Sequence, residues 1–241
     1  MKASFLKAGF DETRCRYTLF DNSQGNIYEP YSTFNKIKQE TSEPFLILCH
    51  QDVLVNQGDN FEQLTKVLTE LDNLDSNWAV VGNAGRNQDF KLVAKITDPN
   101  FTPHWTGQFP QKVHTLDENF LLIKTTANLF CSPELKGFHF YGTDLCLNAI
   151  LKGYSCYVVD FHLTHLSKGN ADWRYRQIEG EFRKKWTPIF QNCYVQKMFM
   201  NNNKLIQYFL EFKPIRLFCW LQPKLKSLFY VYNQFPDSHQ S

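Results

Sequence analysis

Two short apolar runs flank an amphipathic run between residues 45 and 81. FLILC, at residues 45 to 49, and WAVV, at residues 78 to 81, have the length and the side chains of buried strands. Between them, after Asp59 as the expected N-cap, apolar residues recur at helical spacing. These residues are Phe61, Leu64, Val67, Leu68, Leu71 and Leu74. This strand, helix, strand order predicts an α/β protein with a mainly parallel sheet flanked by helices.

Other segments continue the alternation of strands and helices. Helices are expected at residues 1 to 9, 31 to 41, 142 to 152 and 170 to 186. Strands are expected at residues 15 to 20, 113 to 126 and 157 to 165. Residues 86 to 112 are polar, and the pattern predicts irregular structure there.

Composition restricts the class of protein. The chain has 241 residues, of which 43% are hydrophobic and 21% charged, so a sizeable core is expected. A net charge of +2 argues against a dedicated nucleic-acid binder. The seven cysteines form no CxxC pair, which favours reduced thiols in a cytoplasmic protein. No signal peptide is recognisable, and no apolar run approaches the roughly 20 residues of a spanning helix.

The first apolar run ends in the tripeptide His50-Gln51-Asp52. In an extended segment, residues i and i+2 point to the same side, so His50 and Asp52 can reach one cation. An imidazole and a carboxylate suit Mn²⁺ or a similar divalent ion, and diphosphate oxygens would complete its coordination. The alternative is a turn at the strand end in which Asp52 only caps the backbone.

Two other residues are candidates for chemistry. Asp144 lies in the expected first turn of a helix, where the helix dipole favours an ionised carboxylate that could act as a general base. The alternative is simple helix capping. His165 lies near the end of the strand expected at residues 157 to 165 and could bind a metal or phosphate, or could be satisfied by an ordinary hydrogen bond. In parallel sheets ligands bind beyond the carboxyl ends of the strands, which would place Asp21, His50 and Asp52 at one edge.

Several segments in a fixed order resemble one known family. They are DNSQGN, FLILCHQDV, WAVVGNAG, VHTLDENFLLIK and GFHFYGTDLCLNAILKG. Together they are similar to the glycosyltransferase family 2-like group with a GT-A fold, in its prokaryotic branch with HQD in place of DXD. The resemblance covers roughly residues 10 to 190, and we therefore expect a GT-A-like domain at residues 1 to 190.

The resemblance implies a metal-dependent inverting glycosyltransferase. Such an enzyme would move a sugar from a nucleotide-sugar, with a UDP-sugar as the expected donor, to a glycan or lipid-linked acceptor in surface polysaccharide synthesis. Mn²⁺ or Mg²⁺ would be the cofactor. The implied residues are Asp144 as catalytic base; Asp21, Asn22 and Ser23 for the nucleotide; Asp52, His50 and His165 for the metal; and Asp117, His139 and Tyr141 for the acceptor.

The chain also departs from the family pattern. Family members begin with a strand that helps to bind the nucleotide, and this chain begins after it, so the expected sheet lacks its first strand. Such a sheet would expose unpaired backbone and apolar surface. A non-catalytic GT-A-fold binding protein, or a truncated inactive copy, is therefore an alternative. A metal-dependent phosphotransferase or hydrolase is a third hypothesis, but it lacks the acids usual in two-metal sites.

Residues 191 to 241 lie outside the resemblance and form an expected helical C-terminal extension rich in aromatic and basic residues. Between residues 204 and 232, Phe, Tyr and Leu are interleaved with Lys and Arg. This composition suits the headgroup boundary of a membrane, so we expect peripheral contact with the inner face of the membrane. The alternative is packing against the first domain or a second subunit.

Overall fold

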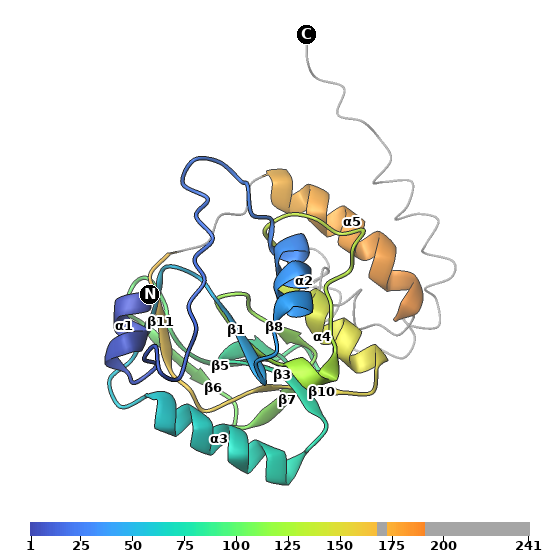
Figure 1. Ribbon diagram of the computed structural model, residues 1–241. Helices are drawn as coiled ribbons and strands as arrows, with labels where there is room; N and C mark the ends of the chain where they lie inside the picture. Colours follow the sequence, from blue (N-terminus) through green and yellow to red (C-terminus); the bar gives the residue numbers. More distant parts are fainter. Residues whose placement is uncertain (168–172, 191–241) are drawn as a thin grey trace. The chain divides into compact units, whose positions relative to one another are not determined.

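The computed structural model describes residues 1–167 and 173–190 and shows a mixed α/β protein with two sheets (Figure 1). The chain divides into two compact units, Met1–Lys185 and Trp186–Ser241. All described strands lie in the first unit. The predicted boundary after residue 190 and the helical extension beyond it lie outside the described residues and stay predictions.

The first sheet has five strands. Its order is β1 (Phe45–Cys49), β9 (Phe120–Lys124), β3 (Trp78–Gly82), β10 (Ser155–Val158) and β7 (Gln111–Val113). β3 and β10 run parallel, whereas β9 runs antiparallel to both β1 and β3, and β7 antiparallel to β10. The strand–helix–strand unit of residues 45 to 81 is therefore present, but β9 lies between its two strands.

The second sheet has six strands. Its order is β2 (Val53–Val55), β11 (Leu163–His165), β5 (Leu92–Thr97), β4 (Ala84–Arg86) and β8 (Thr115–Leu116), and β6 (Pro103–Thr106) also pairs with β5. β11 and β5 are parallel. The other described neighbours in this sheet are antiparallel.

The prediction of a mainly parallel sheet is wrong, because among the described strand pairs only β3–β10 and β5–β11 are parallel. Short loops join the antiparallel pairs β4–β5 and β5–β6, whereas the other antiparallel pairs bring together segments far apart in the chain, which a local pattern cannot predict. Residues 86 to 112, predicted to be irregular, contain β5, β6 and most of β7. Their polarity misled the prediction: all four residues of β6 are exposed, so this strand has no apolar face to recognise.

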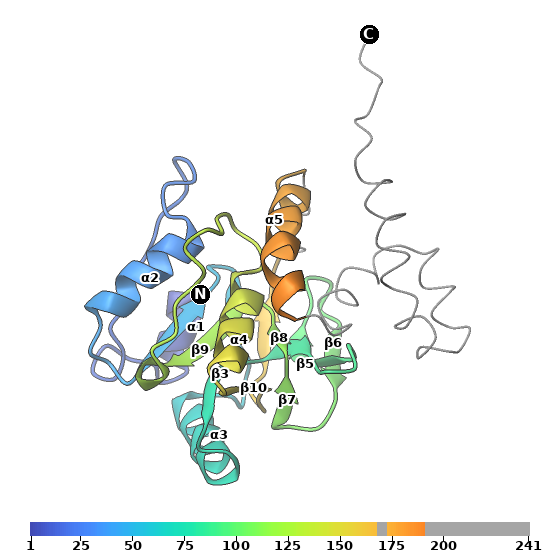
Figure 2. The ribbon, with the colours of Figure 1, turned by 90° about the vertical axis from the view of Figure 1, so that its right-hand side faces the viewer.

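Helices cover both faces of the first sheet (Figures 1 and 2). α1 (Lys2–Lys7) and α3 (Phe61–Leu74) contribute to a core with Trp78 and Val81 of β3 and with Phe120 and Leu122 of β9. α4 (Tyr141–Leu151) is almost entirely buried and lies on the side of the strands opposite to α3. The remaining helices are α2 (Pro30–Glu40), the short 3₁₀ helix η1 (Thr125–Ala127) and α5 (Trp173–Ile189).

Most predicted elements are confirmed to within a few residues, with three corrections. No strand forms at residues 15 to 20, which run as an irregular segment. The strand predicted at residues 157 to 165 is divided between β10 and β11, which belong to different sheets. Asn60, and not Asp59, caps α3: its side-chain oxygen accepts a hydrogen bond from the Gln63 backbone N–H at 2.8 Å.

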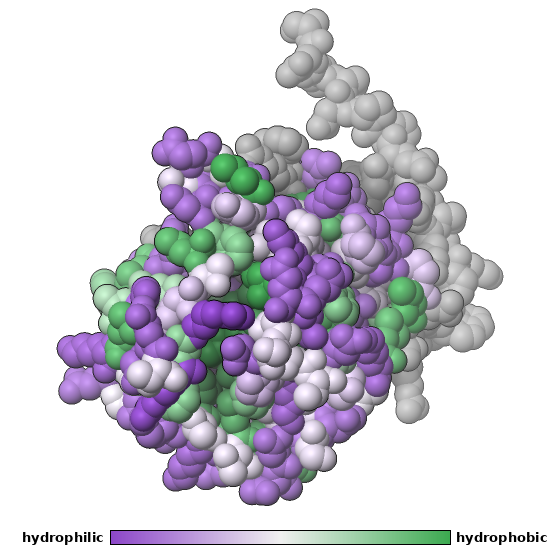
Figure 3. Space-filling model, viewed as in Figure 1, coloured by the Kyte–Doolittle hydropathy of each residue, from purple (hydrophilic) through white to green (hydrophobic). Residues whose placement is uncertain are grey.

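β1 is more exposed than the apolar run predicts. It stands at one end of the strand order of its sheet, and Phe45 and Ile47 are 38% and 36% exposed. On the face of the molecule in Figure 3, hydrophobic residues form separate patches among hydrophilic ones. Among the described helices, none combines the length and the apolar character needed to cross a membrane.

Candidate metal centre

The end of β1 lies where four segments of the first unit meet. The His50 backbone N–H donates to the Asn119 carbonyl oxygen at 3.0 Å, which fixes the strand end against the turn before β9. The Leu166 N–H donates to the Asp52 carbonyl oxygen at 2.9 Å, and His165 pairs with Val53 across the β11–β2 ladder. These backbone contacts bring His165 beside the His50-Gln51-Asp52 tripeptide.

Three predicted metal ligands form one cluster. Ligand atoms of His50, Asp52 and His165 all lie within 4.8 Å of one another. The His165 Nε2 atom is 3.5 Å from Asp52 Oδ1, and the rings of His50 and His165 are 5.7 Å apart between centroids. His165 Nε2 is buried and has no hydrogen-bond partner within the described part of the chain. A buried nitrogen left unbonded is costly, and a cation at this point would satisfy it.

The electrostatics keep two of these ligands in metal-binding form at neutral pH. Burial lowers the pKa of His50, against the opposing charges of Asp117 and Asp52, so its imidazole is neutral. Burial alone would raise the pKa of Asp52. A hydrogen bond from Ser167 and the nearby His165 outweigh that effect and leave the pKa below its ordinary value, so the carboxylate is ionised.

The donor set fits a divalent cation. Two imidazole nitrogens and one carboxylate oxygen suit Mn²⁺, Fe²⁺ or Zn²⁺, whereas Mg²⁺ prefers a shell made of oxygen atoms. Of the two expected cofactors, the donor chemistry therefore favours Mn²⁺. Three protein ligands on one side of an ion would leave coordination positions for a bound substrate.

The residues expected at the acceptor site also surround His50. The Tyr141 hydroxyl lies 3.0 Å from His50 Nε2. The charges of Asp117 and His139 are close enough to shift the pKa of His50 in opposite directions. Asp117 is exposed, and its Oδ1 atom accepts hydrogen bonds from the Asn119 backbone and side chain at 2.9 and 2.5 Å. The structure thus brings the metal and acceptor candidates into one region.

Glu118 was missed in the sequence, although it follows Asp117 directly. Its carboxyl group accepts a hydrogen bond from the Gly142 N–H at 3.3 Å and so caps α4 from another element. Burial, together with the charge of Asp117, raises the pKa of Glu118 to about 8. The only sequence signal was an acid beside an apolar strand, and that does not distinguish a half-buried acid from a fully solvated one.

Asp144 does not line this region as the resemblance implies. It is 0% exposed, and its carboxylate accepts hydrogen bonds from the Ser132 backbone N–H at 2.7 Å and the Ser132 hydroxyl at 2.6 Å. Asn148 donates a third, at 3.2 Å. In this arrangement a substrate hydroxyl has no access to the carboxylate, because protein donors surround it.

The expected nucleotide residues form a local turn. Asp21 Oδ1 accepts from the Ser23 N–H at 2.8 Å, and the Asn22 amide bonds the backbone of Ile27 and Tyr28. The argument that placed Asp21 at the sheet edge depended on a strand that does not form. The role of residues 21 to 23 in nucleotide binding stays a prediction.

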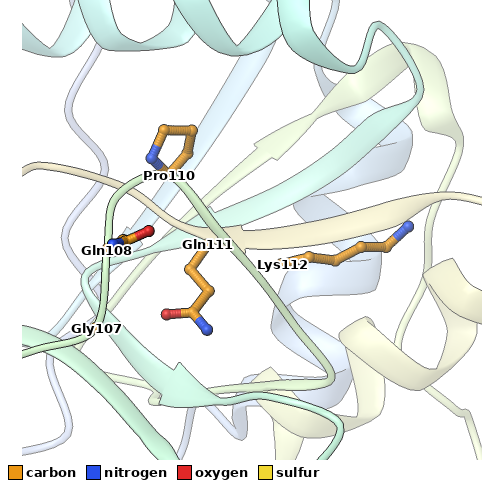
Figure 4. A pocket seen from close by; sticks show the side chains of 5 residues that line it. All are labelled: Gly107, Gln108, Pro110, Gln111 and Lys112. Atoms are coloured by element: carbon orange, nitrogen blue, oxygen red, sulfur yellow. The ribbon is translucent and has the colours of Figure 1, made fainter.

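A hollow of about 400 Å³ lies elsewhere, at the loop between β6 and β7 (Figure 4). Its lining consists of Gly107, Gln108, Pro110, Gln111 and Lys112, and Figure 4 shows the Lys112 side chain extending away from Gly107. It includes none of the candidate site residues.

The fold and the cluster define a mixed α/β protein with a candidate centre of two histidines and one aspartate. No family model matches the chain. It is 32% identical over 194 residues to a protein of Fuscovulum blasticum named "ATP synthase subunits region ORF 6", covering 78% of this chain and 77% of that protein. The chain therefore belongs to the same family as that protein, whose name gives no activity.

Proposed function

We propose that the chain is a metal-dependent inverting glycosyltransferase with a GT-A-like fold. It would transfer a sugar from a nucleotide-sugar to a glycan or lipid-linked acceptor in surface polysaccharide synthesis. The observation that carries the proposal is the His50, Asp52 and His165 cluster, in which the buried Nε2 atom of His165 has no hydrogen-bond partner among the described residues and lies 3.5 Å from Asp52 Oδ1. The resemblance of the HQD tripeptide to the metal motif of that glycosyltransferase group connects this cluster to nucleotide-sugar chemistry.

The three clustered residues would hold the cation. The ion would supply positive charge against the diphosphate that leaves. Asp144 is the base that the resemblance implies, but it is buried among Ser132 and Asn148. In our proposal Asp117 instead accepts the proton of the acceptor hydroxyl, because its carboxylate is exposed and close to His50.

The expected setting of the enzyme is the cytoplasm, at the inner face of the membrane. A lipid-linked acceptor would be presented there. Residues 204 to 232, which lie outside the described residues, supply the aromatic and basic composition that favours contact with lipid headgroups.

A second candidate follows from the donor set itself. Two histidines and one carboxylate are also typical of Fe(II) enzymes that use the open coordination positions for other chemistry. In such an enzyme, a nucleoside diphosphate would not change the affinity for Fe²⁺ or Zn²⁺. Preference for a nucleotide therefore separates the two candidates.

The test is calorimetric titration of the full chain with Mn²⁺, Mg²⁺, Zn²⁺ and anaerobic Fe²⁺, followed by UDP, GDP and CDP with and without each metal that binds. We expect Mn²⁺ to bind and to strengthen the binding of one nucleotide. Asp52→Ala should weaken Mn²⁺ binding by roughly 100-fold or more, since even supporting residues of metal sites contribute 10- to 100-fold. Asp89→Ala, at an exposed aspartate in a loop, is the matched control.

Metal binding that is indifferent to all three nucleotides would favour the second candidate. A folded chain that binds no metal would exclude both and leave the non-catalytic alternative. If Asp117→Asn kept both metal and nucleotide binding but lost sugar transfer, the assignment of the base would be supported.

A further inference from the structure

The Tyr141 hydroxyl lies between two groups that belong to different elements. It is 3.0 Å from His50 Nε2 and 3.3 Å from the Glu118 carbonyl oxygen. Tyr141 is the first residue of α4 and is 5% exposed. Its ring also packs edge-on against Tyr31, with centroids 6.2 Å apart. The hydroxyl is therefore held in place by the surrounding core.

The count of hydrogens at this hydroxyl decides the direction of both contacts. A tyrosine hydroxyl has one hydrogen to donate, and a backbone carbonyl can only accept. If Tyr141 donates to the Glu118 carbonyl, it must accept the hydrogen of His50 Nε2. If Tyr141 donated to His50, the Glu118 oxygen would face an oxygen lone pair with no hydrogen between them. Only the first arrangement satisfies both contacts.

We infer that Tyr141 is a positioning residue that holds His50 in the tautomer with hydrogen on Nε2. The lone pair of His50 is then on Nδ1, which becomes its ligand atom for the cation. In metal sites the hydrogen bond at one ring nitrogen sets which of the two binds metal, and such partners orient the ligand. The inference rests on the proposed metal site and gives Tyr141 a role other than contact with an acceptor.

The rest of the cluster agrees with this assignment. The ring of His165 lies 5.7 Å from that of His50, and its Nε2 atom has no hydrogen-bond partner in the part of the chain that the structure describes. Asp52 offers a carboxylate oxygen 3.5 Å from that atom. With Nδ1 of His50 free of hydrogen, its lone pair is available for the cation that Asp52 and His165 would also bind. A hydrogen on Nδ1 would remove one of the three ligands.

The experiment compares two variants that each remove one buried tyrosine hydroxyl. Tyr141→Phe removes the contact with His50. Tyr31→Phe is the matched control, because Tyr31 is 1% exposed and its hydroxyl donates to the His139 carbonyl at 2.9 Å. The first readout is ¹⁵N NMR of the histidine rings in the metal-free full chain, which distinguishes the two tautomers. The second is the Mn²⁺ affinity of each variant by calorimetry, with unfolding curves to confirm that both variants fold.

We expect the wild-type and Tyr31→Phe spectra to show hydrogen on Nε2 of His50, and Tyr141→Phe to show a mixture of tautomers. Mn²⁺ affinity should fall roughly 10- to 100-fold in Tyr141→Phe and stay within about twofold in the control. Hydrogen on Nδ1 in the wild type, or equal Mn²⁺ affinity in wild type and Tyr141→Phe, would overturn the inference. If the wild type binds no metal, the proposed function fails, and the ring spectra of the same sample still decide the Tyr141 assignment.

Discussion

The carboxylate of Asp144, in the first turn of α4, is fully buried. Its position in the helix follows from the sequence, whereas its burial does not. The two oxygens bind the backbone and hydroxyl of Ser132, so the carboxylate ties the segment before α4 to the helix. Hydrogen bonds to a charged acceptor are stronger than neutral ones, which allows such a group to stay buried.

Asp144→Ala should therefore lower the free energy of unfolding by about 3 kcal/mol, because the Ser132 donors lose their acceptor in a buried place. Urea unfolding followed by circular dichroism measures this change. Asp89→Ala should change stability by less than about 0.5 kcal/mol, as exposed positions do. A variant at position 144 that unfolds like the wild type but transfers no sugar would restore Asp144 as the base.

Glu118 should make stability depend on pH. Its pKa is about 8 in the folded chain and 4.5 in its ordinary state, so folding takes up a proton between these values. The stabilisation is complete below pH 4.5 and is lost as the pH rises towards about 8. The difference in unfolding free energy between wild type and Glu118→Gln should fall by up to about 1.4 kcal/mol per pH unit in that window. Urea unfolding at several pH values measures it, and a difference that is flat from pH 5 to 8 would show that Glu118 is ionised throughout.

At the scale of elements, the N-termini of α3 and α4 are capped by side chains that the periodicity of apolar residues does not identify. Asn60 caps α3, while its neighbour Asp59 accepts a hydrogen bond from the His162 N–H at 3.1 Å. α4 begins after Phe140, whose φ of +66° is in the left-handed region, and Glu118 caps it from the turn before β9. The Asn60 cap is made within the first turn of its own helix, whereas the Glu118 cap connects α4 to a segment far away in the chain.

Asn60→Ala should destabilise the chain by about 1 kcal/mol, since the Gln63 N–H loses its acceptor. Asn60→Asp keeps an oxygen at the same place and should stay close to the wild type. Chemical denaturation of the two variants tests this assignment. If Asn60→Ala unfolded at the same denaturant concentration as Asn60→Asp, the cap would contribute nothing.

At the scale of the whole molecule, the first unit holds both sheets and the candidate metal centre, and the second begins at Trp186. The family relationship covers 78% of the chain. The aromatic and basic segment at residues 204 to 232 is known from its composition, and its contact with a membrane is part of the proposed function.

The full chain should sediment with vesicles that contain anionic lipid. Replacing the five cations of residues 204 to 232 by Gln should weaken this binding by more than tenfold, because each cation near the surface contributes about 1 kcal/mol. The replaced residues are Lys204, Lys213, Arg216, Lys224 and Lys226. High salt should weaken the wild type in the same direction. Equal binding by both proteins to neutral and anionic vesicles would exclude an electrostatic contact.

The sequence by itself determined the local elements and one pair of ligands. β1, α3 and β3 follow from the apolar pattern of residues 45 to 81, because periodicity is a property of a single segment. His50 and Asp52 lie close together because only one residue separates them. The extended geometry predicted for this segment is wrong, however: residues 51 and 52 form a turn in which the Val53 N–H donates to the His50 carbonyl oxygen at 3.4 Å.

The tertiary structure alone decided which segments meet. Antiparallel β9 lies between β1 and β3, and His165 lies beside Asp52 through the β11–β2 ladder. The burial of Asp144 and the contact of Tyr141 with His50 also depend on how α4 packs. These arrangements are set by backbone pairing and packing between residues far apart in the chain. The pattern of one segment does not specify which distant segment it pairs with.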